Sequence, residues 1–156
     1  MDMFDPPYPY HISQYIVDML NKGALDGMID KSANDDYLVT YHDPCNPARG
    51  GQLLEEPRQI IRACCNNFVE MPEDTIREKT YCCGAGGGLL TDEVMPIRMA
   101  GGKPRAMAVK HVKANYLATI CAICKAQLPE AMKYWEVDTE VGGVIQLLGN
   151  ALIINH

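Results

Sequence analysis

The sequence predicts an α/β fold: a single domain in which helices flank a small, mainly parallel sheet. Two observations predict this class. Segments rich in β-branched and aromatic residues alternate with segments whose apolar residues recur at helical spacing. That order is typical of parallel sheets covered by helices. In addition, 156 residues suit one domain with one core. We therefore expect a single domain over residues 1–156.

The first half of the chain predicts helix, strand, helix and strand. Residues 11–22 have an amphipathic helical pattern that ends at Gly23, a residue type common just beyond helix ends. Residues 37–42 are rich in strand-forming side chains. Pro57 suits the first turn of a second helix, because the N–H that proline lacks is not needed there. Residues 68–70 predict a short second strand.

The second half predicts one more strand and three helices. Pro104 is expected to open the first of these helices. Residues 115–120 predict a strand that stops at Cys121, and a helix then runs to about Lys133. Segment 141–153 has a helical apolar face and is expected to close the chain. The strand ends are important because ligand sites of open α/β sheets gather at the carboxyl ends of strands.

The composition argues against two classes of partner. The chain is 47% hydrophobic and 22% charged, with a net charge of −6. This acidic balance argues against nucleic acid as a partner, since phosphate binding needs clustered Lys and Arg. No apolar run approaches the ~18 residues of a transmembrane helix, so we expect no membrane span of its own. The acidic, proline-rich N-terminal segment lacks the apolar core of a signal peptide.

Cysteine is the most informative residue type in the chain. Its count of seven is odd, and no export signal accompanies it. Both facts favour metal or redox chemistry over a disulfide framework. Cys45 and Cys121 each follow a predicted strand. If the loop that carries Cys82 and Cys83 lies at the same sheet edge, five thiols meet there, with Cys124 as the fifth.

The "CAIC" stretch from Cys121 to Cys124 leaves several chemistries open. Two thiolates at the start of a helix can hold a metal or form a thioredoxin-like dithiol. All-cysteine zinc sites usually have two such knuckles, and here the second is missing. The adjacent Cys82 and Cys83 diverge from consecutive Cα atoms, so they chelate one ion poorly but can bind different irons. An iron–sulfur cluster is therefore favoured, with zinc as the alternative in a cluster-depleted sample.

Four glycines follow the adjacent cysteines: Gly84, Gly86, Gly87 and Gly88. Without a Cβ, a backbone can approach an inorganic core closely enough for its N–H groups to donate to sulfur. No Gly-Lys-Ser/Thr follows, so the stretch is not a phosphate-binding loop. We expect these glycines to line the cofactor; a mobile hinge is the alternative.

Three motifs together carry a family resemblance: "YHDPC" (residues 41–45), "CCGAGGG" (residues 82–88) and "CAIC" (residues 121–124). They resemble the cysteine-rich CCG domain of the heterodisulfide reductase family. Within that family, the surrounding sequence is most similar to the branch formed by the K subunits of Dsr membrane complexes and their Hdr-like menaquinol-oxidising relatives. Those proteins are longer and carry an upstream ferredoxin-like region. The chain therefore resembles their C-terminal domain alone.

The resemblance implies a cofactor and its ligands. The family's motif holds a 4Fe–4S-type cluster, in heterodisulfide reductases a noncubane form, and the cluster type stays open here. Carried onto this sequence, the ligands are Cys45, Cys82, Cys83, Cys121 and Cys124. Cys82 and Cys83 would also belong to the catalytic site. The implied chemistry is redox cleavage of a disulfide or trisulfide.

The resemblance also implies partners and a location. They are a quinone-reactive membrane subunit, the other subunits of a Dsr- or Hdr-like complex, and a small sulfur-carrier protein with C-terminal cysteines. The chain would be cytoplasmic, attached peripherally to the inner membrane through these subunits.

Two alternatives remain: an electron-relay subunit of a flavin-linked hydroxyacid or glycerol-phosphate dehydrogenase, and a zinc-stabilised interaction module. Cys64 and Cys65 are expected to pack in the core, and His42 to be structural or to donate to the cofactor.

Overall fold

A small sheet of three parallel strands lies at the centre of the molecule, as the sequence predicted. The computed structural model describes residues 9–153. The strands are β1 (Val39–Tyr41), β2 (Tyr116–Thr119) and β3 (Glu140–Gly143), in spatial order β1-β2-β3. Both strand pairs are parallel, so all three carboxyl ends meet at one edge of the sheet.

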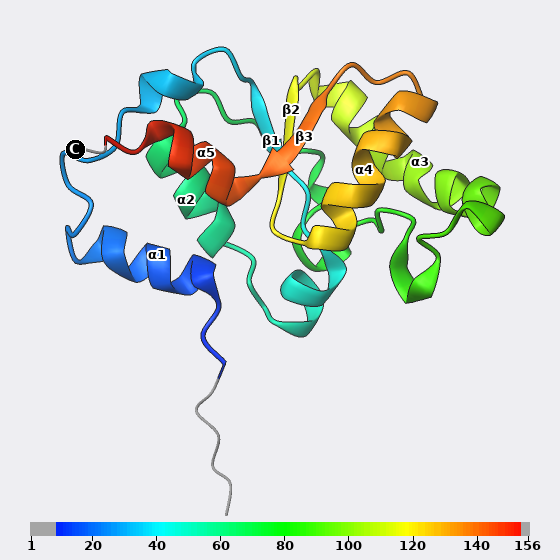
Figure 1. Ribbon diagram of the computed structural model, residues 1–156, viewed down its shortest axis with the longest axis horizontal. Helices are drawn as coiled ribbons and strands as arrows, with labels where there is room; N and C mark the ends of the chain where they lie inside the picture. The colour runs from blue at the N-terminus through cyan, green and yellow to red at the C-terminus, as the bar shows by residue number, and fades with distance from the viewer. Residues whose placement is uncertain (1–8, 154–156) are drawn as a thin grey trace, which may run out of the picture.

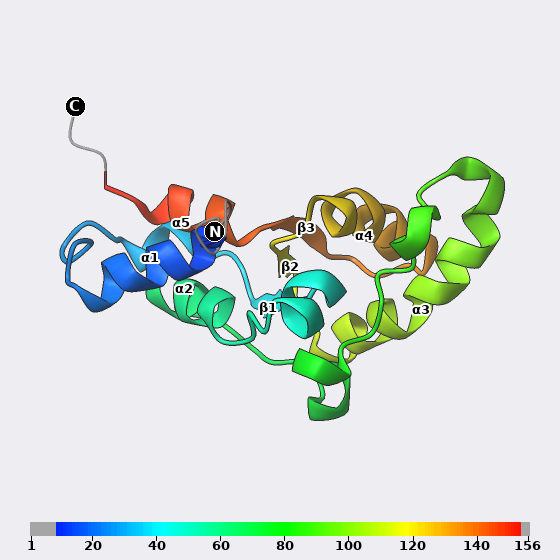
Figure 2. The same ribbon diagram turned by 90° about the horizontal axis from the view of Figure 1, so that it is seen from below.

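Helices cover both faces of this sheet (Figures 1 and 2). Helices α1 (Ile12–Asn21), α2 (Glu56–Cys64) and α5 (Val144–Ala151) lie on one face. Helices α3 (Met95–Val112) and α4 (Ala122–Tyr134) lie on the other. No helix within residues 9–153 combines the length and apolar character needed to cross a bilayer.

Each face of the sheet has its own hydrophobic core. Tyr116 and Ala118 of β2 point into the core beneath α1, α2 and α5. Leu117, between them, is fully buried in the core beneath α3 and α4. Successive side chains of a strand point to opposite faces, so a strand buried on both faces needs no alternating polar positions. This explains why "YLAT" has no polar–apolar alternation.

One predicted helix start and one predicted strand are wrong. Helix α3 begins at Met95, not at Pro104, which lies inside it; Pro96 takes the place in the first turn. A proline in a helix interior costs one backbone hydrogen bond, and here the packing of α3 against α4 outweighs that cost. Residues 68–70 form no strand, since only Phe68 makes an isolated bridge, to Val39.

The third strand, β3, was also missed, because residues 140–143 were not expected to be a strand. Its sequence ends in two glycines, which are depleted in strands. Tertiary packing explains Gly142: a Cβ there would lie 1.8 Å from the Tyr116 hydroxyl oxygen. The bare backbone lets Tyr116 pass over β3, and pairing with β2 then holds the segment extended.

Candidate metal centre

The carboxyl edge of the sheet gathers the predicted cysteines. Cys45 follows β1 and begins a π-helical turn (Asn46–Gly50), and Cys121 follows β2 as the N-cap of α4. Together with Cys83 and Cys124 they line one cavity of about 180 Å³. The cavity wall is completed mainly by the glycine loop and two apolar side chains: Gly86, Gly87, Gly88, Leu90 and Ile123.

Cys82, the fifth predicted ligand, stands just outside that cavity wall. Its Sγ accepts a hydrogen bond from the backbone N–H of Gly84 at 3.3 Å. The position of a Cβ on Gly86 would be 3.6 Å from the same sulfur. The structure therefore brings the five predicted cysteines to one edge, on three separate loops. Their role as ligands remains a prediction.

The two buried thiols at the cavity are coupled to each other. Cys83 is 4% exposed and Cys124 is 3% exposed. A hydrogen bond from the Cys124 thiol lowers the pKa of Cys83 to about 6, and the same bond raises the pKa of Cys124. The pair thus holds one proton between two sulfurs, so that one of them is a thiolate near neutral pH. A thiolate is the form that binds metal.

The donor set fits a multinuclear group better than a single ion. Within residues 9–153, no three His, Cys, Asp or Glu side chains converge closely enough for one metal ion. A structural zinc ion needs four ligands in a tetrahedron. Thiols spread around a cavity suit a cluster, in which separate cysteines bind separate irons.

Several buried polar atoms without partners also fit a site for a polar cofactor. Buried atoms without a hydrogen-bond partner in the described part of the chain include the Tyr41 hydroxyl, the Thr119 hydroxyl and both ring nitrogens of His42. Burial raises the pKa of Tyr41 well above its ordinary value, and the charge of Asp43 adds to that rise. Because buried polar groups normally have partners, these atoms suit a site that binds a polar cofactor.

The first glycine of the loop has a role that the sequence did not reveal. Gly84 adopts φ +99°, and a Cβ there would lie 2.1 Å from the Arg98 carbonyl oxygen and 2.8 Å from the Gly102 nitrogen of α3. The loop is thus pressed against a helix backbone. At Gly87 and Gly88, by contrast, no atom lies within 4 Å of a Cβ position. Binding of a cofactor by these glycines stays a prediction.

We expect Gly84→Ala to destabilise the fold strongly. The added methyl group meets the α3 backbone and the residue must keep a left-handed conformation, at a combined cost of roughly 3 kcal/mol or more. Gly87→Ala is the control, because it has φ +68° and open space around its Cβ position. It should cost only about 1 kcal/mol. Urea unfolding measures both, and equal losses would contradict the close-approach explanation.

A buried ion pair anchors the loop that carries Cys45. Arg58 of α2 donates to both carboxylate oxygens of Asp43, at 2.6 and 2.8 Å, and both side chains are fully buried. It also pairs with Glu70 at 2.7 Å. The Thr80 hydroxyl donates to the Asp43 carbonyl at 2.7 Å. Asp43 thus connects the first cysteine loop to the chain just before Cys82, a role with no signal in the sequence pattern.

His42 is buried beside the site and is neutral. Its side chain has no hydrogen-bond partner among the described residues, and only its backbone N–H is bonded, to Ala118. Burial lowers the pKa of His42 well below 6.5, and the charge of Arg105 adds to this effect. Both interpretations of His42 remain open: a structural residue, or a neutral N–H donor to a bound group.

Lowering the pH from about 7 to about 5 is expected to weaken the fold through His42. Between the depressed native pKa and the unfolded value, the unfolded chain binds more protons than the native chain. This stability is fully present above about pH 6.5 and falls by up to about 1.4 kcal/mol per pH unit below it. Urea unfolding across this range should show a shallower slope in His42→Leu. Identical slopes would mean that His42 does not carry the effect.

Cys64 and Cys65 lie in the other core, as predicted. They are 0% and 3% exposed and pack among residues of α1, α2 and α5. Their Sγ atoms are 3.8 Å apart. They are therefore separated by the sheet from the core that holds Cys83 and Cys124.

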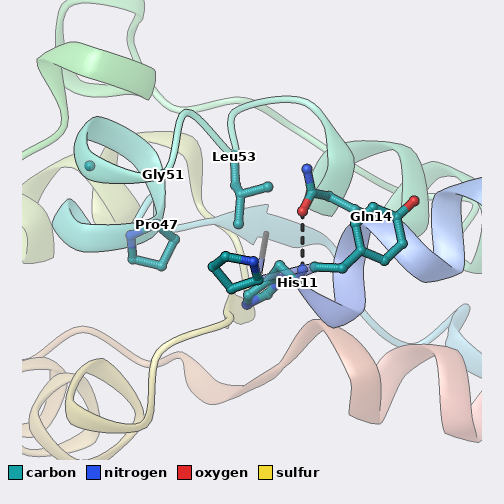
Figure 3. Close-up of a pocket in the computed structure, with 8 residues that line it drawn as sticks. His11, Gln14, Pro47, Gly51 and Leu53 are labelled. Atoms are coloured by element: carbon teal, nitrogen blue, oxygen red, sulfur yellow. Dashed lines mark hydrogen bonds between the residues drawn. The ribbon is translucent and has the colours of Figure 1, made fainter. Parts of the chain in front are cut away.

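A larger hollow of about 490 Å³ lies on the far side of the Cys45 loop. Figure 3 shows it between the start of α1 and that loop, with His11 and Gln14 facing Pro47, Gly51 and Leu53. The Gln14 side chain accepts from the His11 N–H at 3.0 Å and so caps α1. No cysteine is among the described residues that line it, and its size does not make it the metal centre.

The fold and the site together define a class: a parallel α/β domain that gathers cysteines from three loops around one cavity. The sequence model of the cysteine-rich CCG domain matches residues 39–129. That segment contains the five predicted ligands and more than half of the chain. The chain belongs to this cysteine-rich domain family.

Curated relatives are similar along nearly the whole chain. An Hdr-like menaquinol oxidoreductase iron–sulfur subunit 2 of Archaeoglobus fulgidus is 51% identical over 148 residues, which cover 92% of this chain and 26% of that protein. One subunit of the dihydromethanophenazine:CoB–CoM heterodisulfide reductase of Methanosarcina acetivorans is 32% identical over 91% of this chain and 33% of its own length. One subunit of the fumarate reductase (CoM/CoB) of Methanothermobacter marburgensis is 31% identical over 90% of this chain and 26% of its own length.

The chain thus spans between about a quarter and a third of the length of these relatives. No solved structure matches it significantly. All three relatives are named as subunits of oxidoreductases, and one is named as an iron–sulfur subunit.

Proposed function

We propose that the chain is the cysteine-rich redox domain of a heterodisulfide-reductase-like iron–sulfur subunit and binds a 4Fe–4S-type cluster. The observation that carries this proposal is the single cavity shared by Cys45, Cys83, Cys121 and Cys124, with Cys82 beside it. Such a cluster supplies one electron at a time and an iron that can bind a substrate sulfur. Five sulfurs leave both a cubane and a noncubane form open.

The chain's own residues would prepare the site in three ways. Cys83 and Cys124 share one proton, so one thiolate is present before a metal binds. The loop of Gly86, Gly87 and Gly88 leaves one wall of the cavity free of side chains, which admits a substrate sulfur. Ile123 and Leu90 add apolar side chains to the cavity wall, which would limit water there.

The proposed substrate is a disulfide or trisulfide, and the reverse thiol oxidation is equally compatible with the site. Support comes from relatives that are named as heterodisulfide reductase and menaquinol oxidoreductase subunits. We propose the corresponding partners: a quinone-reactive membrane subunit, further subunits of a Dsr- or Hdr-like complex, and a sulfur-carrier protein with C-terminal cysteines. Attachment to the cytoplasmic face of the inner membrane would follow from that assembly.

The decisive experiment is anaerobic reconstitution followed by iron and acid-labile sulfide analysis. We expect about four irons per chain, the content of one such cluster. EPR of the oxidised protein should then change when a small thiol or dithiol is added, because substrate sulfur binds at the cofactor. Zinc without iron or sulfide would support the interaction-module alternative instead.

The electron-relay alternative is distinguished by the same sample. It is kept because one relative is named as a fumarate reductase (CoM/CoB) subunit. A relay cluster has no need to bind substrate. Four irons with an EPR spectrum that is unchanged by thiol would therefore favour the relay over thiol–disulfide chemistry.

A further inference from the structure

One arginine beneath the cysteine edge lacks the anion that a buried guanidinium normally has. Arg105 of α3 is 0% exposed. Its Nη2 donates to the Thr75 carbonyl at 2.6 Å and to the Thr80 hydroxyl at 3.0 Å, and its Nη1 contacts the Met71 sulfur at 2.9 Å. All three acceptors are neutral, and its Nε has no partner among the described residues.

The other two buried arginines show what is missing. Arg58 pairs with Asp43 and Glu70, at 2.6 and 2.7 Å. Arg98, also on α3, pairs with Glu130 at 2.7 Å and with Asp92 at 3.3 Å. Within residues 9–153, no carboxylate forms an ion pair with Arg105. A buried charge without a counter-charge is strongly destabilising, so we expect such a charge to have a compensating group.

The surroundings of Arg105 point toward the cysteine site. Its guanidinium lies 5.8 Å from the ring centroid of Tyr81, the residue directly before Cys82. Through Thr80 it is bonded to the same chain segment. Burial lowers the pKa of Arg105 to about 10, and the negative charge of Asp43 opposes that change. At neutral pH the group is therefore still a cation.

We propose that Arg105 is the counter-cation of the cysteine site. It is a positioning residue: its positive charge offsets the negative charge of the thiolates and of the bound cluster, and its hydrogen bond to Thr80 holds the guanidinium next to the Cys82 loop. The inference deepens the proposed function and rests on it. A fixed positive charge near a cluster favours the reduced, more negative state, because net charge is one of the factors that set cluster potentials. Arg105 would therefore raise the reduction potential of the site.

The first test compares two substitutions at Arg105 in the reconstituted protein. Arg105→Gln removes the charge, and Arg105→Lys keeps it while losing the guanidinium fork. In an EPR-monitored redox titration we expect the Gln variant to shift to a lower midpoint potential and the Lys variant to stay close to the wild type. Arg98→Gln is the matched control, because it removes a buried α3 arginine that already has carboxylate partners; its potential should not move.

The second test leaves Arg105 in place and needs no iron. Met71→Glu puts a carboxylate where the Met71 sulfur now contacts Arg105, and Met71→Gln is the uncharged control of the same shape. In the iron-free chain, M71E should have a higher Tm than M71Q, since it gives the lone cation a partner. In the loaded chain, the same variant should lower the midpoint potential relative to M71Q.

The outcomes separate the two proposals. If the wild type binds no iron, the proposed function fails, and the iron-free Tm comparison still decides whether Arg105 is an uncompensated cation. If iron binds but Arg105→Gln and Arg105→Lys have equal potentials, the counter-cation is overturned and the proposed function survives. Equal Tm values for iron-free M71E and M71Q would also overturn the proposal that Arg105 is the counter-cation.

Discussion

Cys83→Ser is expected to remove most of the iron from the reconstituted chain, whereas Cys64→Ser should leave the iron content unchanged. Cys83 lines the cavity and is hydrogen-bonded to Cys124, so its loss removes a ligand and the partner of a second thiol. A serine hydroxyl is a poor ligand for iron at neutral pH because it stays protonated. We expect about four irons per chain to fall below about one.

The Cys64→Ser control is matched in burial, residue type and chemical change. Cys64 is 0% exposed, against 4% for Cys83, and it packs in the core on the other face of the sheet. Both variants therefore place a hydroxyl in an apolar core and suffer a similar loss of stability. Iron analysis and EPR then report ligation alone. Iron lost at position 64 and kept at position 83 would reverse the ligand assignment.

Arg58→Met is expected to cost about 3 to 5 kcal/mol of unfolding free energy, the range seen when one partner of a buried ion pair is removed. It leaves the fully buried Asp43 carboxylate with one remaining side-chain bond in the described structure, from the backbone N–H of Arg77 at 2.9 Å. Since Asp43 holds the Cys45 loop, the same variant should also bind iron more weakly. Urea unfolding of the iron-free chain measures the first effect separately.

Arg62→Met is the matched control on the same helix. The Arg62 side chain is 50% exposed, and its contacts with Glu70 and Glu55 are 3.5 and 4.0 Å long. Exposed ion pairs of this kind contribute less than about 1 kcal/mol. If the two arginine variants were equally stable, the buried pair would not be the anchor that its geometry indicates.

Sequence pattern predicted the elements whose signal is local. Residues 11–22 showed a helical apolar stripe, and α1 is found at Ile12–Asn21. Strand-forming residues at 115–120 predicted a strand, and β2 is found at Tyr116–Thr119. The pattern was wrong where packing decided: Pro104 is tolerated inside α3, and the glycine-ended β3 is a strand because β2 pairs with it.

Some features of the candidate site could likewise be predicted from the sequence, and others could not. Strand ends and residue type were enough to predict that five cysteines gather at one edge of the sheet. Their role as ligands came from the family resemblance and stays a prediction. Strand ends and residue type were not enough to predict that Gly84 accommodates the α3 backbone, or that Asp43, Thr80 and Arg105 join two of the cysteine loops. The contacts of Thr80 with Asp43 and with Arg105 bridge 37 and 25 residues along the chain, and no periodicity encodes such pairs.

By itself, the sequence determined the fold class, the family resemblance and the chemistry that cysteine can supply. These depend on residue types and on spacing along the chain, which a sequence displays directly. Only the tertiary structure decided which charges are compensated. A guanidinium without a counter-charge and an imidazole without a hydrogen-bond partner are destabilising only when they are buried. Burial is a property of the folded chain. That is why Arg105 and His42 look ordinary in the printed sequence, although they lie beneath the cysteine edge in the folded protein.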